Sequence, residues 1–210
     1  MIKSTLLPAA VTASLLLPAF AGDHGDGSER VLPMLFHEGT GNGRWASVND
    51  TVMGGVSSSR HELTEDGTFI FRGNLSLENN GGFASVRSRM EPMDLAGADA
   101  FRLRVRGDGH RYQLRFRVDG EWSWVNYWQG FDTKAGEWIE VELPVEGFRA
   151  GWRGEPVPQA PAFDPARPFE ITLMATDKQE GEFELEVDWI SAVFRAEPTA
   201  GPAEAPGQGI

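Results

Sequence analysis

Hydrophobic and polar residues alternate through the middle of the chain, a pattern typical of β-strands with one buried face. The alternation is clearest in the stretch 101–128, where three alternating runs are separated by the turn sequences 107–110 and 119–120. The second turn is Asp119-Gly120, a pair typical of two-residue hairpin turns. We therefore expect residues 101–128 to form three consecutive antiparallel strands.

The predicted two-residue turn fixes which residues of the second and third runs face each other. Phe116 would lie opposite Ser123 on the face that joins the core, and Arg115 would lie opposite Trp124 on the other face. That other face would bring arginine and tryptophan side chains together, and it is our candidate binding face. Its residues are Arg102, Arg104, Arg111, Arg115, Arg117, Trp122, Trp124, Asn126 and Trp128.

Two interpretations of Trp122, Trp124 and Trp128 remain open. A second sheet could cover them as part of the core, or they could line an open or groove-like surface. The first arrangement would bury Arg115 and Arg117, which is costly unless carboxylates pair with them, so we favour the open face. Tryptophan is enriched at the energetic centres of protein interfaces. Indole beside guanidinium also suits sugar rings and anionic groups, so the face fits a protein partner or a glycan.

Shorter alternating runs predict further strands on both sides of this stretch. They cover 69–77, 83–88, 138–144, 171–175 and 183–189. Residues 146–168 contain five prolines and predict an irregular segment, whose buried anchors we expect to be Phe148, Trp152 and Phe163. Many short strands with turn signals between them indicate an all-β sandwich of jelly-roll character. We assign residues 31–195 to this single domain.

The two ends of the chain differ in composition from this domain. Residues 1–21 carry Lys3, an apolar run and a small-x-small sequence that ends at Ala21, as in a secretory signal peptide. The apolar run is too short to span a bilayer. We therefore expect no membrane span and a periplasmic or secreted protein, with cleavage near Ala21. Residues 22–30 predict a flexible leader, and residues 196–210 predict a disordered tail.

Composition narrows the classes of function. The formal net charge of -12 argues against binding of nucleic acid. The absence of cysteine excludes disulfides, thiol catalysis and cysteine-bound zinc. The four histidines show no metal-ligand spacing, and no nucleophile or phosphate-loop motif is present. We expect no enzyme, no cofactor and no metal site, with a hydrolase of periplasmic glycans as the weakest alternative. A calcium ion at Asp50 or Asp188 would suit such a sandwich, but no ligand spacing supports it.

Two glycine-rich loops carry the most specific pattern in the chain. Their key residues are Asn49, Asp50, Met53, Gly54, Gly55, Ser57, Gly81, Gly82, Phe83 and Arg87. Glycine pairs permit positive φ or a close approach of the backbone. The loops could form a fixed rim beside the binding face. Alternatively they serve packing alone, with Asn49, Asp50 and Asn79 satisfying buried amides, and we favour this second interpretation.

Together these loops, with Gly136-Glu137-Trp138 and the closing run 183–190, resemble the NADH:ubiquinone oxidoreductase complex I intermediate-associated protein 30 family over residues 36–194. The resemblance implies a galactose-binding-like β-sandwich, in agreement with the strand pattern. It also implies a non-catalytic assembly factor or chaperone-like protein, because the mitochondrial members hold intermediates of respiratory complex I. The predicted export signal would place this chain on the opposite side of the membrane from the peripheral arm of complex I. An envelope protein or a glycan would then be the partner.

Overall fold

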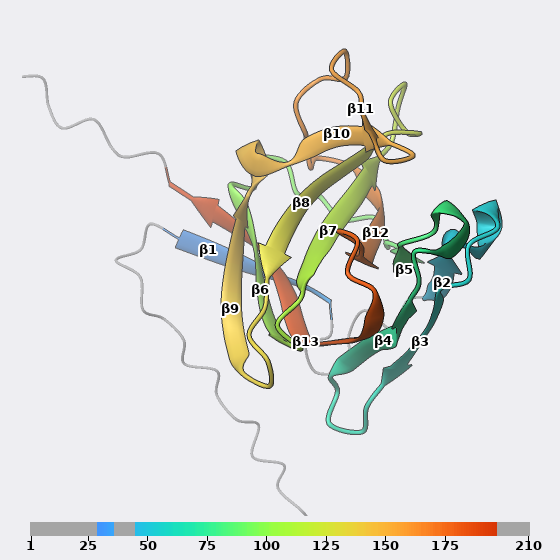
Figure 1. Ribbon diagram of the computed structural model, residues 1–210. Helices are drawn as coiled ribbons and strands as arrows, with labels where there is room; N and C mark the ends of the chain where they lie inside the picture. Colours follow the sequence, from blue (N-terminus) through green and yellow to red (C-terminus); the bar gives the residue numbers. More distant parts are fainter. Residues whose placement is uncertain (1–28, 36–44, 197–210) are drawn as a thin grey trace, which may run out of the picture.

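The computed structural model describes residues 29–35 and 45–196. Within these ranges the chain forms β-strands and short 3-10 turns, and no α-helix occurs there. Two antiparallel sheets pack face to face, which confirms the predicted all-β jelly-roll sandwich (Figure 1).

The first sheet has six strands. Its order is β3 (Ser58–Leu63), β4 (Phe69–Leu75), β13 (Gly181–Arg195), β6 (Ala100–Gly107) and β9 (Trp138–Pro144), and β1 (Glu29–Leu35) also pairs with β13. β13 is the longest strand and pairs with β4, β6 and β1 along its length.

The second sheet has seven strands. Its order is β11 (Glu155–Pro156), β10 (Arg149–Trp152), β8 (Asn126–Asp132), β7 (Arg111–Val118), β12 (Pro168–Ala175), β5 (Ala84–Arg89) and β2 (Ala46–Asn49). Three 3-10 turns connect strands in the described part of the chain: η2 (Asp50–Met53), η3 (Glu78–Asn80) and η4 (Val145–Gly147). Figure 1 shows η2 and η3 together at the β2–β5 end of this sheet.

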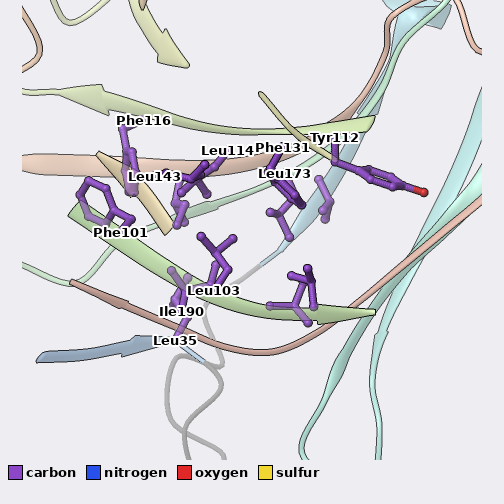
Figure 2. Close-up of a cluster of buried hydrophobic side chains, with 14 of the residues drawn as sticks. Leu35, Phe101, Leu103, Tyr112, Leu114, Phe116, Phe131, Leu143, Leu173 and Ile190 are labelled. Atoms are coloured by element: carbon purple, nitrogen blue, oxygen red, sulfur yellow. The ribbon is translucent and has the colours of Figure 1, made fainter. Parts of the chain in front are cut away.

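The core lies between the sheets, where the apolar face of each strand meets the opposite sheet. Figure 2 shows Phe101 and Leu103 of β6 close to Leu114 and Phe116 of β7. All four side chains are at most 1% exposed, and the ring centroids of Phe101 and Phe116 lie 4.5 Å apart. Full burial stabilises the fold by about 1.5 to 3 kcal/mol per large apolar side chain. The alternating pattern assigned these four residues to the buried face, and the structure confirms that assignment.

The stretch 101–128 does not form one continuous sheet, so that prediction is wrong. β6 pairs with β9 and β13, whereas β7 pairs with β8 and β12 in the other sheet. The turn between β6 and β7 carries the chain across the sandwich. Within it, Asp108 accepts hydrogen bonds from the Tyr112 hydroxyl at 2.9 Å and from the Glu184 amide at 2.7 Å. Alternation identifies a strand but does not say which sheet the strand joins.

The predicted register between β7 and β8 is also wrong. Phe116 faces Tyr127, not Ser123, so the pairing has moved by four residues along the third run. Because four is an even number, the side chains of β8 still point to the faces that the alternation assigned to them.

The register moves because residues 119–125 form a loop and not a two-residue turn. The amide of Val125 closes a turn on the carbonyl of Trp122 at 2.9 Å. Val125 is fully buried, and Trp122 packs against the core. Burial of these two apolar side chains therefore outweighs the hairpin preference of Asp119-Gly120.

The proline-rich segment 146–168 is partly regular, since it contains η4, β10 and β11. Phe148 and Phe163 are each 7% exposed, which confirms them as buried anchors. Trp152 is 40% exposed, so its assignment as an anchor is wrong. It lies beside the turn between β10 and β11, where its ring contacts that of Trp124 and not the core.

β1 begins at Glu29, two residues before the predicted start of the domain. Glu29 and Arg30 pair with Arg195 and Phe194 of β13, so they are part of the sheet and not of a flexible leader. The rest of that leader, the predicted signal peptide and the tail from residue 197 lie outside the described residues.

Candidate functional site

The outward face of the seven-stranded sheet holds the centre of the predicted binding face. Strand register places one row of side chains across it, and this row consists of Arg87, Thr172, Arg115, Trp128 and Arg149. The alternate residues of the same strands, such as Leu114 and Leu173, belong to the core. The row therefore points away from the core. We call this row, with Ser85, Gln113, Arg117, Glu170 and Met174 beside it, the outer face.

Arg115 lies in the middle of the outer face. Its Nε and Nη2 donate hydrogen bonds of 3.0 and 2.6 Å to Oε1 of Gln113. Within residues 29–35 and 45–196 no carboxylate lies within 4 Å of this guanidinium. Desolvation by burial and, to a smaller extent, the positive charge of Arg87 lower the pKa of Arg115 to about 10, although Asp177 acts in the opposite direction.

Arg87 lies on β5, on the other side of β12 from Arg115. Its Nε is buried and has no hydrogen-bond partner among the described residues. No carboxylate in that part of the chain lies within 4 Å of it. Thr172, which separates the two arginines, is 6% exposed. Two guanidinium groups with no described carboxylate within 4 Å thus flank one threonine.

Two further arginines on this side of the sheet, Arg117 and Arg111, are paired with carboxylates. Arg117 donates to the carbonyl of Ser123 at 2.8 Å, and its Nη1 lies 3.7 Å from Glu170. Arg111 lies 3.1 Å from Asp132. These two residues therefore hold the edges of the outer face in place.

The three predicted tryptophans do not stack on these arginines. Trp128 lies over Gly151 of β10, because a Cβ at Gly151 would be 3.1 Å from the indole nitrogen. Asn126 is the cross-strand partner of Gly151. Among the described residues, the cation–π pairs of tryptophan involve Trp138 and Trp152 alone. The predicted array of alternating guanidinium and indole groups is therefore absent from this part of the chain.

Trp122 and Trp124 lie in the loop 119–125 and not on a strand. Trp122 packs against the core, as the alternative interpretation predicted, whereas Trp124 is 37% exposed. The ring centroid of Trp124 lies 5.8 Å from that of Trp122 and 5.7 Å from that of Trp152. Trp124 and Trp152 form an exposed indole pair at the β8–β10 side of the outer face.

Arg102 and Arg104 do not contribute to the outer face, which corrects the prediction. Both lie on β6 and point outward from the six-stranded sheet. Arg102 bonds Glu142 at 2.8 Å and Glu29 at 3.1 Å, and Arg104 pairs with Asp188. They form an ion-pair surface of the ordinary solvated kind.

The two glycine-rich loops meet at the carboxylate of Asp50, which is fully buried. Ser57 donates to it through its amide at 2.9 Å and its hydroxyl at 2.5 Å. The amides of Gly82 and Phe83 donate at 2.7 and 3.3 Å. Burial tends to raise the pKa of Asp50, but these hydrogen bonds outweigh it and hold the pKa below the usual 3.8. The predicted role of Asp50 in satisfying buried amides is confirmed.

The glycines of both loops serve this arrangement in two ways. A Cβ at Gly55 or Gly81 would overlap the carboxyl group of Asp50. Gly54 and Gly82 have positive φ, of 92° and 119°. The backbone must approach the carboxylate closely and also turn sharply, and glycine meets both requirements.

The asparagines of these loops act differently from the prediction. Asn49 accepts a hydrogen bond from the hydroxyl of Ser59 at 2.7 Å, so it satisfies a side chain and not an amide. Asn79 adopts φ 56°, a left-handed conformation that asparagine tolerates better than most residues. Its contribution is therefore to the shape of the second loop.

The first loop exposes apolar side chains beyond its buried anchor. Val52, Met53 and Val56 are 69%, 62% and 50% exposed. We call these three residues the apolar knob. The loop pattern in the sequence points to Met53 but not to Val52 or Val56, because nothing in the sequence shows which side chains the turn η2 leaves outside.

The described residues hold no cluster of three or more histidine, aspartate or glutamate side chains suited to a metal ion. Of the two residues considered for calcium, Asp50 is enclosed by hydrogen-bond donors and Asp188 pairs with Arg104.

A hollow on the outward face of the six-stranded sheet is lined by side chains of both charges. Arg72 in that hollow pairs with Glu62 at 2.5 Å, so its charge is largely compensated. No helix in the described ranges is long and apolar enough to cross a membrane.

Comparison with known proteins gives a family and a set of structural neighbours. The family model described as complex I intermediate-associated protein 30 matches residues 34–187. A search of curated proteins gave no match. Similar solved structures include the family 11 carbohydrate-binding module of a cellulosomal cellulase of Clostridium thermocellum, at a TM-score of 0.59 and 14% identity, over 81% of this chain and 97% of that one.

Two further structures have the same fold. The same type of module from Clostridium thermocellum, in complex with a β-1,3-1,4-mixed-linked tetrasaccharide, gives a TM-score of 0.59 at 14% identity, over 81% of this chain and 98% of that one. An agarase gives a TM-score of 0.52 at 14% identity, over 80% of this chain but 25% of its own. At these identities the likeness shows the fold alone.

Proposed function

Because this chain belongs to the complex I intermediate-associated protein 30 family, we propose that it is a non-catalytic binding protein of the assembly-factor type. In this proposal it holds a protein partner at the β2–β5 end of the sandwich. The family match supports an assembly role. Asp50 binds the backbone, and Arg111 and Arg117 pair with carboxylates, so these three charged groups are not arranged for proton transfer.

The apolar knob is the observation that carries this proposal. Three exposed apolar side chains lie within five residues, in the loop that gives the family its pattern. The loop is held by a buried carboxylate, so the knob is presented in one conformation and little conformational entropy is lost on binding. A rigid apolar projection suits a protein surface better than a sugar, because sugars offer mainly hydroxyl groups.

Export remains part of the proposal. The N-terminal pattern that ends at Ala21 supports cleavage and a periplasmic or secreted domain. Mass spectrometry of the N-terminus of the natural protein tests this directly. A mature chain that begins at Gly22 is the expected result, and an intact N-terminus in the cytoplasm would overturn the export proposal while leaving the family role in place.

The binding proposal is tested by partner capture from membrane and periplasmic fractions with the tagged full-length chain. We expect the double variant Val52→Ser with Met53→Ser to lose partners that the unchanged protein retains. The matched control is Leu63→Ser, because Leu63 is also exposed, at 43%, but lies on β3 away from the knob. Both variants should keep the melting temperature, since the substituted side chains are exposed.

Identification of the captured proteins then separates the two kinds of partner. Complex I subunits would support the family role, and envelope proteins would support a partner outside the cytoplasm. Equal capture by the knob variant and the unchanged protein would contradict the proposed binding surface.

A second function, carbohydrate binding, is favoured by one specific observation. Trp124 and Trp152 form an exposed indole pair with ring centroids 5.7 Å apart, and aromatic faces can stack on sugar rings. The structural neighbours that are carbohydrate-binding modules add to this alternative. A glycan array with titration of tryptophan fluorescence tests it, with Trp124→Ala as the variant. Binding that disappears in this variant supports the alternative, and silence across the array removes it.

A further inference from the structure

Arg87 and Arg115 differ from the other arginines in the described part of the chain. Every other half-buried arginine there has a carboxylate within 4 Å, and these are Arg72, Arg102, Arg104 and Arg117. Arg87 and Arg115 are half-buried too, but they have no such partner in that part. A guanidinium taken partly out of water without a counter-charge is costly. Here the fold places two of them on either side of one strand.

Register and strand spacing bring these two side chains to one place. Both are cross-strand partners of Thr172, and all three leave the same face of the sheet. Adjacent strands lie about 4.8 Å apart, so the Cα atoms of the two arginines are about 10 Å apart. The charge of Arg87 acts on the pKa of Arg115, which places the two groups within electrostatic reach of each other. A small anion above Thr172 can contact both arginines.

The residues around Arg115 hold its guanidinium group in an orientation that leaves part of it available to a ligand. Gln113 is 5% exposed, and its Oε1 accepts hydrogen bonds from Nε and Nη2 of Arg115. Its Nε2 donates to Asp177 at 3.5 Å, which fixes which end of the amide faces the arginine. The guanidinium is thus oriented through one edge, and its Nη1 has no partner among the described residues. Arg87 likewise keeps a buried Nε without a partner in that part of the chain.

We propose that Arg87, Thr172 and Arg115 form a binding site for a carboxylate group presented by an acidic side chain of the protein partner. Guanidinium forks match the planar carboxylate and form charge-assisted hydrogen bonds with it. Thr172 adds a hydroxyl donor between them. A bound carboxylate supplies a counter-charge at contact distance, whereas Asp177 acts on Arg115 only from farther away.

The position of the site connects it to the apolar knob. Arg87 lies five residues after Gly82, on the strand that begins directly after the second glycine-rich loop. At about 3.3 Å per residue this is about 17 Å along the sheet from Gly82, and Gly82 bonds Asp50 in the loop that carries the knob. One protein partner can therefore span both the knob and the site. The assignment of the carboxylate to a protein partner rests on the proposed function, whereas the carboxylate-binding site formed by Arg87, Thr172 and Arg115 does not.

The test uses the full chain with hexaglutamate as the probe and hexaglutamine as the uncharged comparison. NMR signals of the arginine Nε–H groups are followed during the titration, and the variants Arg87→Met and Arg115→Met assign them. We expect hexaglutamate, and not hexaglutamine, to shift the signals of both arginines. Each variant should weaken binding about tenfold or more, the loss expected for a charge-assisted hydrogen bond.

Two controls keep the result interpretable. Arg104→Met removes a paired arginine from the other sheet and should leave hexaglutamate binding unchanged. Arg87→Met should not lower the melting temperature, because it replaces a partly buried charge, whose buried Nε has no hydrogen-bond partner among the described residues, by an apolar side chain of similar length. Loss of binding with a retained melting temperature therefore separates a ligand site from a structural role.

Three outcomes would overturn the inference. They are an absence of shifts in the two arginine signals, equal weakening by Arg104→Met, and binding of an oligogalacturonate at these residues without binding of hexaglutamate. The last outcome would assign the carboxylate to an acidic glycan. Because the probe is a peptide and not the partner, this test can fail while the knob variant still loses its partner, and the reverse also holds.

Discussion

The amide of Gly82 donates a 2.7 Å hydrogen bond to Oδ2 of Asp50, a residue that lies 32 positions earlier in the chain. This contact joins the two glycine-rich loops into one unit at the end of β2 and β5. The carboxylate of Asp50 accepts from four donors in total, and all of them lie in these loops. The conformation of the loop that carries the apolar knob therefore depends on the side chain of Asp50, which is fully buried.

Replacement of Asp50 by alanine should destabilise the protein strongly. The change leaves the amides of Ser57, Gly82 and Phe83 without their acceptor, and a buried unsatisfied donor costs about 1 to 3 kcal/mol. We expect the free energy of unfolding to fall by roughly 3 kcal/mol or more, measured by urea denaturation. Asp66→Ala is the control, because Asp66 is exposed and should change stability by less than about 0.5 kcal/mol.

Stability should also fall in acid because of Asp50. Its pKa in the folded protein lies below 3.8, the usual value that we take for the unfolded chain. A carboxyl group with a lowered folded pKa contributes stability that is fully present above its unfolded pKa and is lost as the pH falls through the folded pKa. Glu142, bonded by Arg102 and Arg195, has a lowered pKa and acts in the same direction.

Urea denaturation of the unchanged protein and of Asp50→Asn from neutral pH down to about pH 2 measures this effect. We expect the difference in unfolding free energy between the two proteins to be largest above the usual pKa of aspartate and to shrink as the pH falls below it. A difference that stays constant across this range would contradict the assignment to Asp50.

The adjacent glycines Gly54 and Gly55 should respond differently to alanine. A Cβ at Gly54 meets open space, so Gly54→Ala costs only the strain of its positive φ, about 1 to 2 kcal/mol. A Cβ at Gly55 overlaps the carboxyl group of Asp50, which is fixed by its donors and cannot move away cheaply. We expect Gly55→Ala to lower the melting temperature by clearly more than Gly54→Ala. Equal effects would mean that the carboxylate is free to shift.

Arg104 should matter little for binding or for stability. It lies on the six-stranded sheet with a partly exposed ion pair to Asp188 and its guanidinium 5.0 Å from the Trp138 ring. Pairs of this kind contribute about 0 to 1 kcal/mol. Arg104→Ala should therefore leave partner capture unchanged and alter the unfolding free energy, measured in urea, by no more than about 1 kcal/mol. Loss of partner capture by Arg104→Ala would contradict this prediction and would place the binding surface on β6.

Sequence alone determined the strand content, the assignment of side chains to faces and the importance of the two glycine-rich loops. These features are local, because a strand places alternate residues on opposite faces whatever it pairs with. The alternation of 101–105 and 112–118 therefore identified Phe101 and Phe116 as core residues correctly. The glycine pairs likewise marked the loops, since only glycine allows the backbone to pass so close to another group.

The tertiary structure decided which strands are neighbours and hence which charges meet. Arg102 lies beside Glu142 and Arg115 beside Trp128 because β6 and β7 enter different sheets, and a turn sequence does not encode that crossing. Burial of Val125 moved the hairpin register by competing with a local turn preference. Only the folded chain showed that Asp50 reaches both loops, that the knob is exposed, and that Arg87 and Arg115 share Thr172. Each of these depends on contacts between residues far apart in sequence, which the order of the residues does not state.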